Sequence, residues 1–123
     1  MILISHRGNI NGKDESKENK PSYIVDAIRK GYNVEVDFWY DNGKFVLGHD
    51  EPQYSIPIDF IENYYRYLWI HCKNHDALSK LVEIDRGGVY FNYFWPITEP
   101  IHDNEVMIST NLTIIRRNSF EWY

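Results

Sequence analysis

Apolar and polar positions along this chain alternate between strand-like and helix-like spacing. Residues 2–5 form a short apolar run, and residues 33–39 (NVEVDFW) place apolar and polar side chains in alternation over most of their length. Between them, residues 21–31 carry apolar side chains on one helical face, with Pro21 in the first turn and Gly31 at the end. This part of the sequence therefore predicts a strand, a helix and a second strand.

The same kind of pattern continues past the middle of the chain. The turn sequence DNG at 41–43 favours a hairpin that leads into a short strand at 44–48. We expect a helix at 56–67, a strand at 67–72 and another helix at 74–85. Strands that alternate with helices indicate an α/β fold with parallel strands.

The helix predicted at 74–85 has its own start signal and apolar face. Asn74 suits the N-cap position, and Leu78, Leu81 and Val82 share one side of the helix. Beyond this helix, strands are predicted at 87–95 and 105–110, and the tail at 111–123 fits no single pattern.

Composition narrows the class of protein. The 123 residues suit one domain that spans positions 1–123, and a net charge of −5 with both signs interspersed argues against a nucleic-acid partner held by a basic face. The single cysteine, Cys72, excludes an intrachain disulfide and fits a reducing compartment. The start of the chain has no basic leader, and no apolar run approaches the roughly 20 residues of a membrane span. We therefore expect a soluble cytoplasmic protein.

Chargeable side chains stand where the predicted strands end or on one face of them. His6 and Arg7 follow the first strand, and Glu35 and Asp37 point to the same side of the second. Two carboxylates at this spacing, roughly 6.5–7 Å apart along the backbone, repel each other unless a cation lies between them. Oxygen ligands of this kind suit Mg²⁺, Ca²⁺ or Mn²⁺. The alternative is a solvated strand face without an ion.

Two further pairs follow the same rule. His49 and Asp50 follow the strand predicted at 44–48, and His71 and Lys73 alternate on a strand whose other side carries Ile70 and Cys72. A histidine can exchange a proton near neutral pH, and a lysine can bind an anion such as phosphate. Taken singly, these pairs also fit a surface turn and an edge strand. Together, the four clusters predict a metal-assisted phosphoryl site.

The order of these clusters resembles the glycerophosphodiester phosphodiesterase family, part of the phospholipase-C-like phosphodiesterase superfamily. The resemblance covers roughly the first 75 positions. Its motifs are HRG at 6–8, EN at 18–19, E-x-D at 35–37, HD at 49–50 and H-x-K at 71–73. The resemblance implies a TIM-type (β/α) barrel and metal-dependent hydrolysis of a small phosphodiester. It also implies catalytic roles for His6 and His49, phosphate binding by Arg7 and Lys73, support from Asn19 and Asp50, and one divalent ion held by Glu35, Asp37 and His71.

Three departures from the family pattern qualify these expectations. His71 stands where the family has a glutamate, so the metal preference has moved toward Mn²⁺ or Zn²⁺, the ion binds weakly, or His71 acts through hydrogen bonds. Lys17 replaces a proline of the family's loop motif. A complete barrel takes about 250 residues, so the expected fold is a partial or minimised barrel. Its open edge would be covered by the tail or by a second copy of the chain, which predicts a homo-oligomer. The alternative to an enzyme is a non-catalytic module on the same fold, which binds phosphate or a polyol or serves a structural role.

Overall fold

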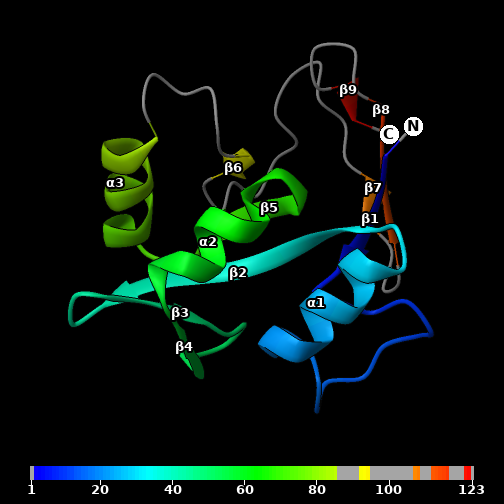
Figure 1. The fold of residues 1–123 in the computed structure, drawn as a ribbon, viewed down its shortest axis with the longest axis horizontal. Coiled ribbons are helices and arrows are strands. Elements are labelled where there is room, and N and C mark those ends of the chain that lie inside the picture. Colours follow the sequence, from blue (N-terminus) through cyan, green and yellow to red (C-terminus); the bar gives the residue numbers. More distant parts are fainter. Residues whose placement is uncertain (1, 86–91, 95–106, 109–111, 117–120, 123) are drawn as a thin grey trace.

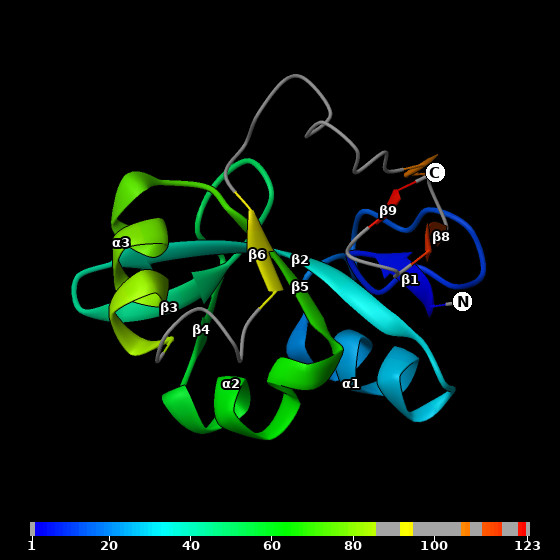
Figure 2. The same ribbon diagram turned by 90° about the horizontal axis from the view of Figure 1, so that it is seen from above.

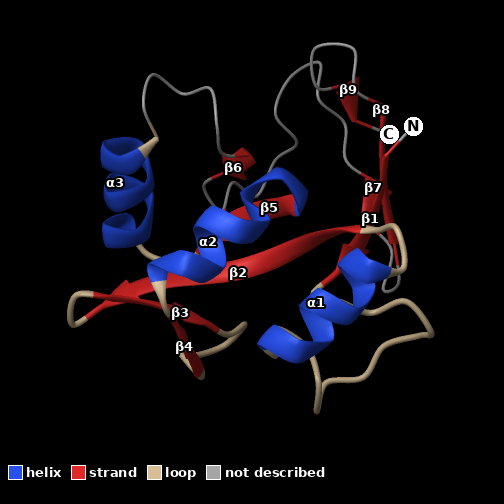
Figure 3. Cartoon of the chain, viewed as in Figure 1, coloured by secondary structure: helices blue, strands red, loops and turns tan. Residues whose placement is uncertain are grey.

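The computed structural model describes residues 2–85, 92–94, 107–108, 112–116 and 121–122. In these residues nine strands form one sheet, onto which three helices pack (Figure 1). Figure 3 shows the same elements coloured by type. The strands are β1 (Ile2–His6), β2 (Asn33–Asp41), β3 (Lys44–Leu47), β4 (Tyr54–Ile56), β5 (Leu68–Cys72), β6 (Asn92–Phe94), β7 (Met107–Ile108), β8 (Leu112–Arg116) and β9 (Glu121–Trp122). The helices are α1 (Pro21–Arg29), α2 (Ile58–Tyr64) and α3 (His75–Ile84), and a 3₁₀ turn, η1 (Tyr65–Tyr67), follows α2.

Strand β2 is the centre of the sheet. One of its edges pairs in parallel with β5 along residues 34–38. Its other edge is shared by two strands, because β1 pairs with the first part of β2 in parallel and β3 pairs with the last part in antiparallel orientation. Strand β4 extends the sheet beyond β3, β6 pairs with β5, and β8 joins β1 to β7 and β9.

The expected partial TIM-type barrel with parallel strands is wrong. Five of the eight strand pairings are antiparallel, and the sheet is open (Figure 2). Asn42 and Gly43, with φ of 50° and 75°, reverse the chain after β2, so β3 returns beside it without a helical crossover. Strand β8 runs antiparallel along the outer edge of β1, where a TIM-type barrel would have a parallel strand.

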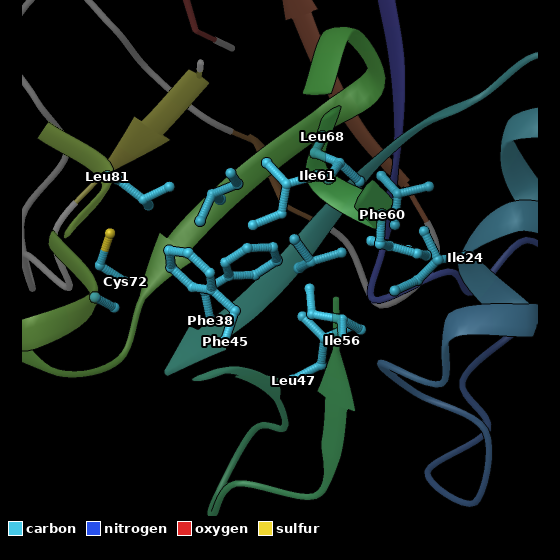
Figure 4. Close-up of a cluster of buried hydrophobic side chains, with 14 of the residues drawn as sticks. Ile24, Phe38, Phe45, Leu47, Ile56, Phe60, Ile61, Leu68, Cys72 and Leu81 are labelled. Carbon is cyan, nitrogen blue, oxygen red and sulfur yellow. The ribbon is translucent and has the colours of Figure 1, made fainter. Parts of the chain in front are cut away.

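The hydrophobic core lies on one face of the sheet. All three helices contribute buried apolar side chains to it, and Figure 2 shows α1 and α2 on the same side of β2 and β5. Figure 4 shows side chains of this cluster meeting between the helices and the strands. Its buried members are Ile24, Ala27, Val34, Val36, Phe38, Phe45, Leu47, Ile56, Phe60, Ile61, Leu68, Ile70, Cys72, Ala77 and Leu81.

The helices differ in detail from the sequence prediction. The Asn74 side chain accepts a hydrogen bond from the Ala77 amide at 2.9 Å, so the predicted N-cap is confirmed. In α3 the predicted apolar face is confirmed for Leu81, which is buried, and for Leu78, which packs against the core, but it is wrong for Val82, which is 56% exposed. The helix predicted at 56–67 is confirmed over α2, which begins after Pro57 and continues as η1, whereas Ile56 belongs to β4.

The C-terminal predictions are only partly covered by the described residues. Within the segments predicted as strands, 92–94 and 107–108 are strands, and the remainder lies outside the described residues. The ambiguous tail contains β8 and β9. Across the helices that are described, none is long and apolar enough to cross a membrane.

Candidate functional site

The carboxyl ends of β1 and β3 meet on one edge of β2. Strand β1 runs parallel to β2 and ends where His6 lies opposite Glu35. Strand β3 runs the other way and ends where Leu47 lies opposite Phe38. The two strands therefore approach each other and stop on either side of Val36 and Asp37. The loops that follow them leave the sheet side by side, although they are far apart in the sequence.

The side chain of Asn19 fills the gap between these two strand ends. Its Oδ1 accepts a hydrogen bond from the Asp37 amide at 3.0 Å, and its Nδ2 donates to Asp37 Oδ2 at 2.8 Å. Asn19 itself has a φ of 64°, a left-handed conformation that asparagine tolerates better than most residues. Its amide donates to the Arg7 carbonyl at 3.1 Å. Asn19 thus provides hydrogen bonds to β2 at a position that neither β1 nor β3 pairs with, and it orients the Asp37 carboxylate.

Asp37 is the centre of the polar cluster and is fully buried. Its Oδ2 also lies 3.1 Å from Arg7 Nε and 3.4 Å from His49 Nδ1, and its Oδ1 lies 3.2 Å from His71 Nδ1. Burial opposes ionisation of this carboxyl, but hydrogen bonds from His71 and Asn19 and the charge of Arg7 outweigh it and lower the pKa of Asp37. Asp37 is therefore a carboxylate at neutral pH.

Glu35 lies beside Asp37 on the same face of β2. Its surroundings favour the protonated carboxyl group, whereas those of Asp37 favour the carboxylate. Glu35 is 4% exposed, and its Oε1 has no hydrogen-bond partner among the described residues. Burial and the charge of Asp37 raise the pKa of Glu35 well above its usual value. One ligand atom each from Glu35, Asp37 and His71 lie within 4.8 Å of one another. A divalent cation at this point would offset the repulsion between the carboxylates, so the three side chains fit a metal ion.

Arg7 follows β1 in a left-handed conformation, with φ of 57°, and three groups surround its guanidinium. Nη1 donates to Glu18 Oε1 at 3.1 Å, Nη2 lies 3.1 Å from His49 Nε2, and Nε forms the ion pair with Asp37. Glu18 also accepts a hydrogen bond from Asn9 Nδ2 at 2.6 Å. Glu18, whose role was open from the sequence, therefore positions Arg7 and ties down the loop after β1.

This loop presents Glu18 and Asn19 without the proline that the resemblance would place at position 17. The Lys17 amide donates to the Asp14 carbonyl at 3.0 Å, a bond that proline cannot make. The Glu18 amide donates to the same carbonyl at 3.1 Å. A turn closed by these two bonds shapes the loop at the position where the family pattern has proline.

A cavity of about 540 Å³ opens between the loops that follow β1 and β3. His6 faces this cavity, where burial and the neighbouring charge of Arg7 lower the pKa of His6 to about 4. His6 is therefore neutral at pH 7. The residues that line the cavity are all polar or charged: His6, Arg7, Lys13, Glu15, Glu18, Asn19, His49, Asp50, Glu51 and Gln53.

Two of the predicted site residues lie at the margin of the cluster. The side chain of Asp50 is 95% exposed, and its Oδ1 lies 3.7 Å from His49 Nε2. Lys73 is half-buried just after β5, where its amide donates to the Phe38 carbonyl at 2.7 Å. The other predicted residues come together around Asp37: His6, Arg7, Asn19, Glu35, His49 and His71.

Two residues that the sequence analysis did not select hold His49 in place. Trp39 Nε1 donates to the Gly48 carbonyl at 2.7 Å. A side chain at Gly48 would clash with the Glu51 carbonyl oxygen, so the tight turn there needs glycine. A glycine directly before the His-Asp pair was the available sequence signal, whereas nothing in the sequence indicated the role of Trp39.

Comparisons of the chain with protein-family models, with curated proteins and with solved structures found no match.

Proposed function

We propose that this chain is a metal-dependent phosphodiester hydrolase that acts on glycerophosphodiester-like substrates. One observation carries the proposal. The meeting of β1 and β3 places two histidines and an arginine next to a pair of buried carboxylates. The resemblance of the motifs to the glycerophosphodiester phosphodiesterase family supports the same reaction.

Charge in the site is arranged for a phosphate group. Glu35, Asp37 and His71 would hold the divalent ion. When bound, such an ion supplies positive charge that draws electron density from a phosphoryl oxygen. Arg7 lines the cavity and offers a planar set of donors to the remaining phosphate oxygens. Lys73, just beyond β5, adds a further positive charge at the margin of the cluster.

The two histidines divide the proton transfers. His6 is neutral at pH 7 because of its lowered pKa, so it accepts the proton of the attacking hydroxyl group as the oxygen bonds to phosphorus. The bond between phosphorus and the departing alcohol oxygen breaks, and His49 gives that oxygen a proton. Each such transfer contributes about 10²–10⁴-fold to the rate. The products are a phosphate monoester, formed directly or through a cyclic phosphate, and an alcohol.

The test is hydrolysis of glycerophosphoethanolamine and glycerophosphocholine by the full chain in the presence of Mg²⁺, Ca²⁺, Mn²⁺ or Zn²⁺. His6→Ala and His49→Ala should each lose at least about 100-fold in turnover while their circular dichroism spectra stay unchanged. His75→Ala is the matched control, because this histidine is exposed and does not line the cavity. Full turnover in both site variants would show that these histidines are not the acid–base pair.

One observation favours a second candidate, a module that binds phosphate or a polyol without turning it over. The guanidinium of Arg7 is already engaged by Glu18, Asp37 and His49. A site in this state can hold a ligand at its mouth without bringing it to the metal ligands. For this candidate, glycerol phosphate would raise the melting temperature while no product appears with any ion.

A further inference from the structure

The three side chains that fit a metal ion are not equivalent in chemistry. Glu35 and Asp37 offer carboxylate oxygens, whereas His71 offers an imidazole nitrogen. Magnesium and calcium bind almost entirely through oxygen ligands. Imidazole suits zinc, iron, copper and nickel, and affinity for nitrogen donors rises along the first transition row.

The register of the sheet places this nitrogen next to the carboxylates. In the parallel pair of β2 and β5, Asp37 lies opposite His71, so both side chains emerge on the same face. The adjacent residues Ile70 and Cys72 point into the core and fix the orientation of the strand. Rotation of the strand to bring another residue to this position would expose that core. An ion that binds Asp37 and Glu35 therefore meets His71 as its third ligand.

The surroundings of Asp37 also determine which of its oxygens faces the ion. Oδ2 is approached by Asn19, Arg7 and His49, whereas Oδ1 lies on the side of His71. Oδ2 is therefore crowded, and Oδ1 is the oxygen that lies on the side of the imidazole. Carboxylate and imidazole donors thus converge on one point.

We infer that this site selects zinc over magnesium and calcium, and that His71 is the residue that sets this selectivity. The inference rests on the metal site of the proposed function. It does not depend on which substrate is cleaved or on whether turnover occurs.

The test measures binding of each metal ion alone to the metal-stripped full chain by isothermal titration calorimetry. Wild type should bind Zn²⁺ at least about 100-fold more tightly than Mg²⁺ and Ca²⁺, with Mn²⁺ between them. In His71→Glu this ratio should fall at least about tenfold, because three carboxylates suit the harder ions. Bound Co²⁺ should show the visible absorption of a nitrogen-ligated ion in wild type and lose it in the variant.

Two controls keep the result specific to this site. His75→Glu makes the same substitution at an exposed histidine outside the cluster and should leave every affinity unchanged. Glu35→Gln should weaken all four ions together. If His71→Glu does not fold, His71→Asn removes the nitrogen donor with less added charge and should lose the preference for Zn²⁺.

Three outcomes would overturn the inference. Equal affinities of wild type for Zn²⁺ and Mg²⁺ would show that the site does not select. An unchanged ratio in both His71 variants would show that another group selects. Absence of binding by any ion would remove the metal site and the proposed hydrolase with it. By contrast, selective binding without diester hydrolysis would leave the inference standing and reject only the proposed function.

Discussion

The two faces of β2 carry opposite kinds of side chain. On one face, Val34, Val36 and Phe38 lie fully buried against the helices. On the other, Glu35 and Asp37 are just as inaccessible but are surrounded by polar groups. Side chains on both faces of β2 are therefore buried, but burial affects the free energy of folding differently on the two faces. Apolar burial stabilises the fold in proportion to area, whereas a buried carboxylate costs free energy unless a partner offsets it.

This difference between the two faces predicts which substitutions change stability and which change ion binding. Substitutions on the core face should change the free energy of unfolding and leave ion binding intact in whatever protein still folds. Substitutions on the polar face should change ion binding and have a smaller effect on the free energy of unfolding. The following predictions are ordered by the size of their effect on stability.

Phe38→Ala should have the largest effect, because this ring is fully buried and lies 5.6 Å from the Phe45 ring. Removing such a ring costs about 3–5 kcal/mol of stability through lost burial and the cavity left behind. Urea denaturation followed by circular dichroism measures this loss. Val82→Ala is the control on an exposed apolar side chain and should stay within about 0.5 kcal/mol of wild type. A loss of less than about 1 kcal/mol for Phe38→Ala would contradict the packing described for this face.

Asn19→Gly should have an intermediate effect. Glycine keeps the backbone free to adopt the left-handed conformation at φ 64° but removes the carboxamide that bridges the gap beside β2. The Asp37 amide and carboxylate each lose a hydrogen-bond partner, so the cost should be about 1–3 kcal/mol. Urea denaturation measures the cost, and faster hydrogen exchange at the Asp37 amide should accompany it.

A matched substitution sharpens this prediction. Asn19→Asp keeps an oxygen that can accept from the Asp37 amide but places a second negative charge beside the Asp37 carboxylate. It should be less stable than Asn19→Gly at neutral pH. Wild-type stability in Asn19→Gly would show that the carboxamide does not tie the loop after β1 to β2.

Glu35→Gln should have the smallest effect on stability, within about 1 kcal/mol in either direction near pH 4.5, because the amide keeps the shape of the protonated carboxyl group. The raised pKa of Glu35 means that the folded protein binds this proton more tightly than the unfolded chain. Metal-free wild type should therefore lose stability as the pH rises from about 4.5 through the raised pKa, and Glu35→Gln should not. Thermal melts across this pH range provide the measurement, and parallel curves for the two proteins would contradict the assignment.

The individual strands, helices and turns were largely predictable from the sequence, but the pairing of strands that are distant along the chain was not. Alternation in NVEVDFW correctly placed Val34 and Phe38 on one face and Asp37 on the other, since a strand has a side-chain period of two. The hairpin turn at Asn42 and Gly43 was also predicted, and it makes β3 antiparallel to β2. The pairing of β8 with β1 is a long-range contact, and no local pattern in either strand specifies it.

The residues of the candidate site were likewise only partly predictable from the sequence. His6, Arg7 and His49 were selected because each follows a strand, and the structure brings their side chains together around Asp37. The supporting residues were harder to find. Glu18 acts through contacts with Arg7 and Asn9 at the other end of its loop, so its role depends on a loop conformation that the sequence does not display.

The anchoring of the two loops has a consequence for how this protein can diversify. Asn19 fastens the loop after β1 at its base, and Gly48 fastens the loop after β3 at its own. The outer positions Lys13 and Glu15 border the cavity but do not hold those bases. Insertions or exchanges at the tip of the loop after β1 would reshape the entrance while the polar cluster around Asp37 keeps its place. The scaffold thus separates the shape of the entrance from the arrangement of the buried polar groups, and a library randomised only at this tip would explore the first without disturbing the second.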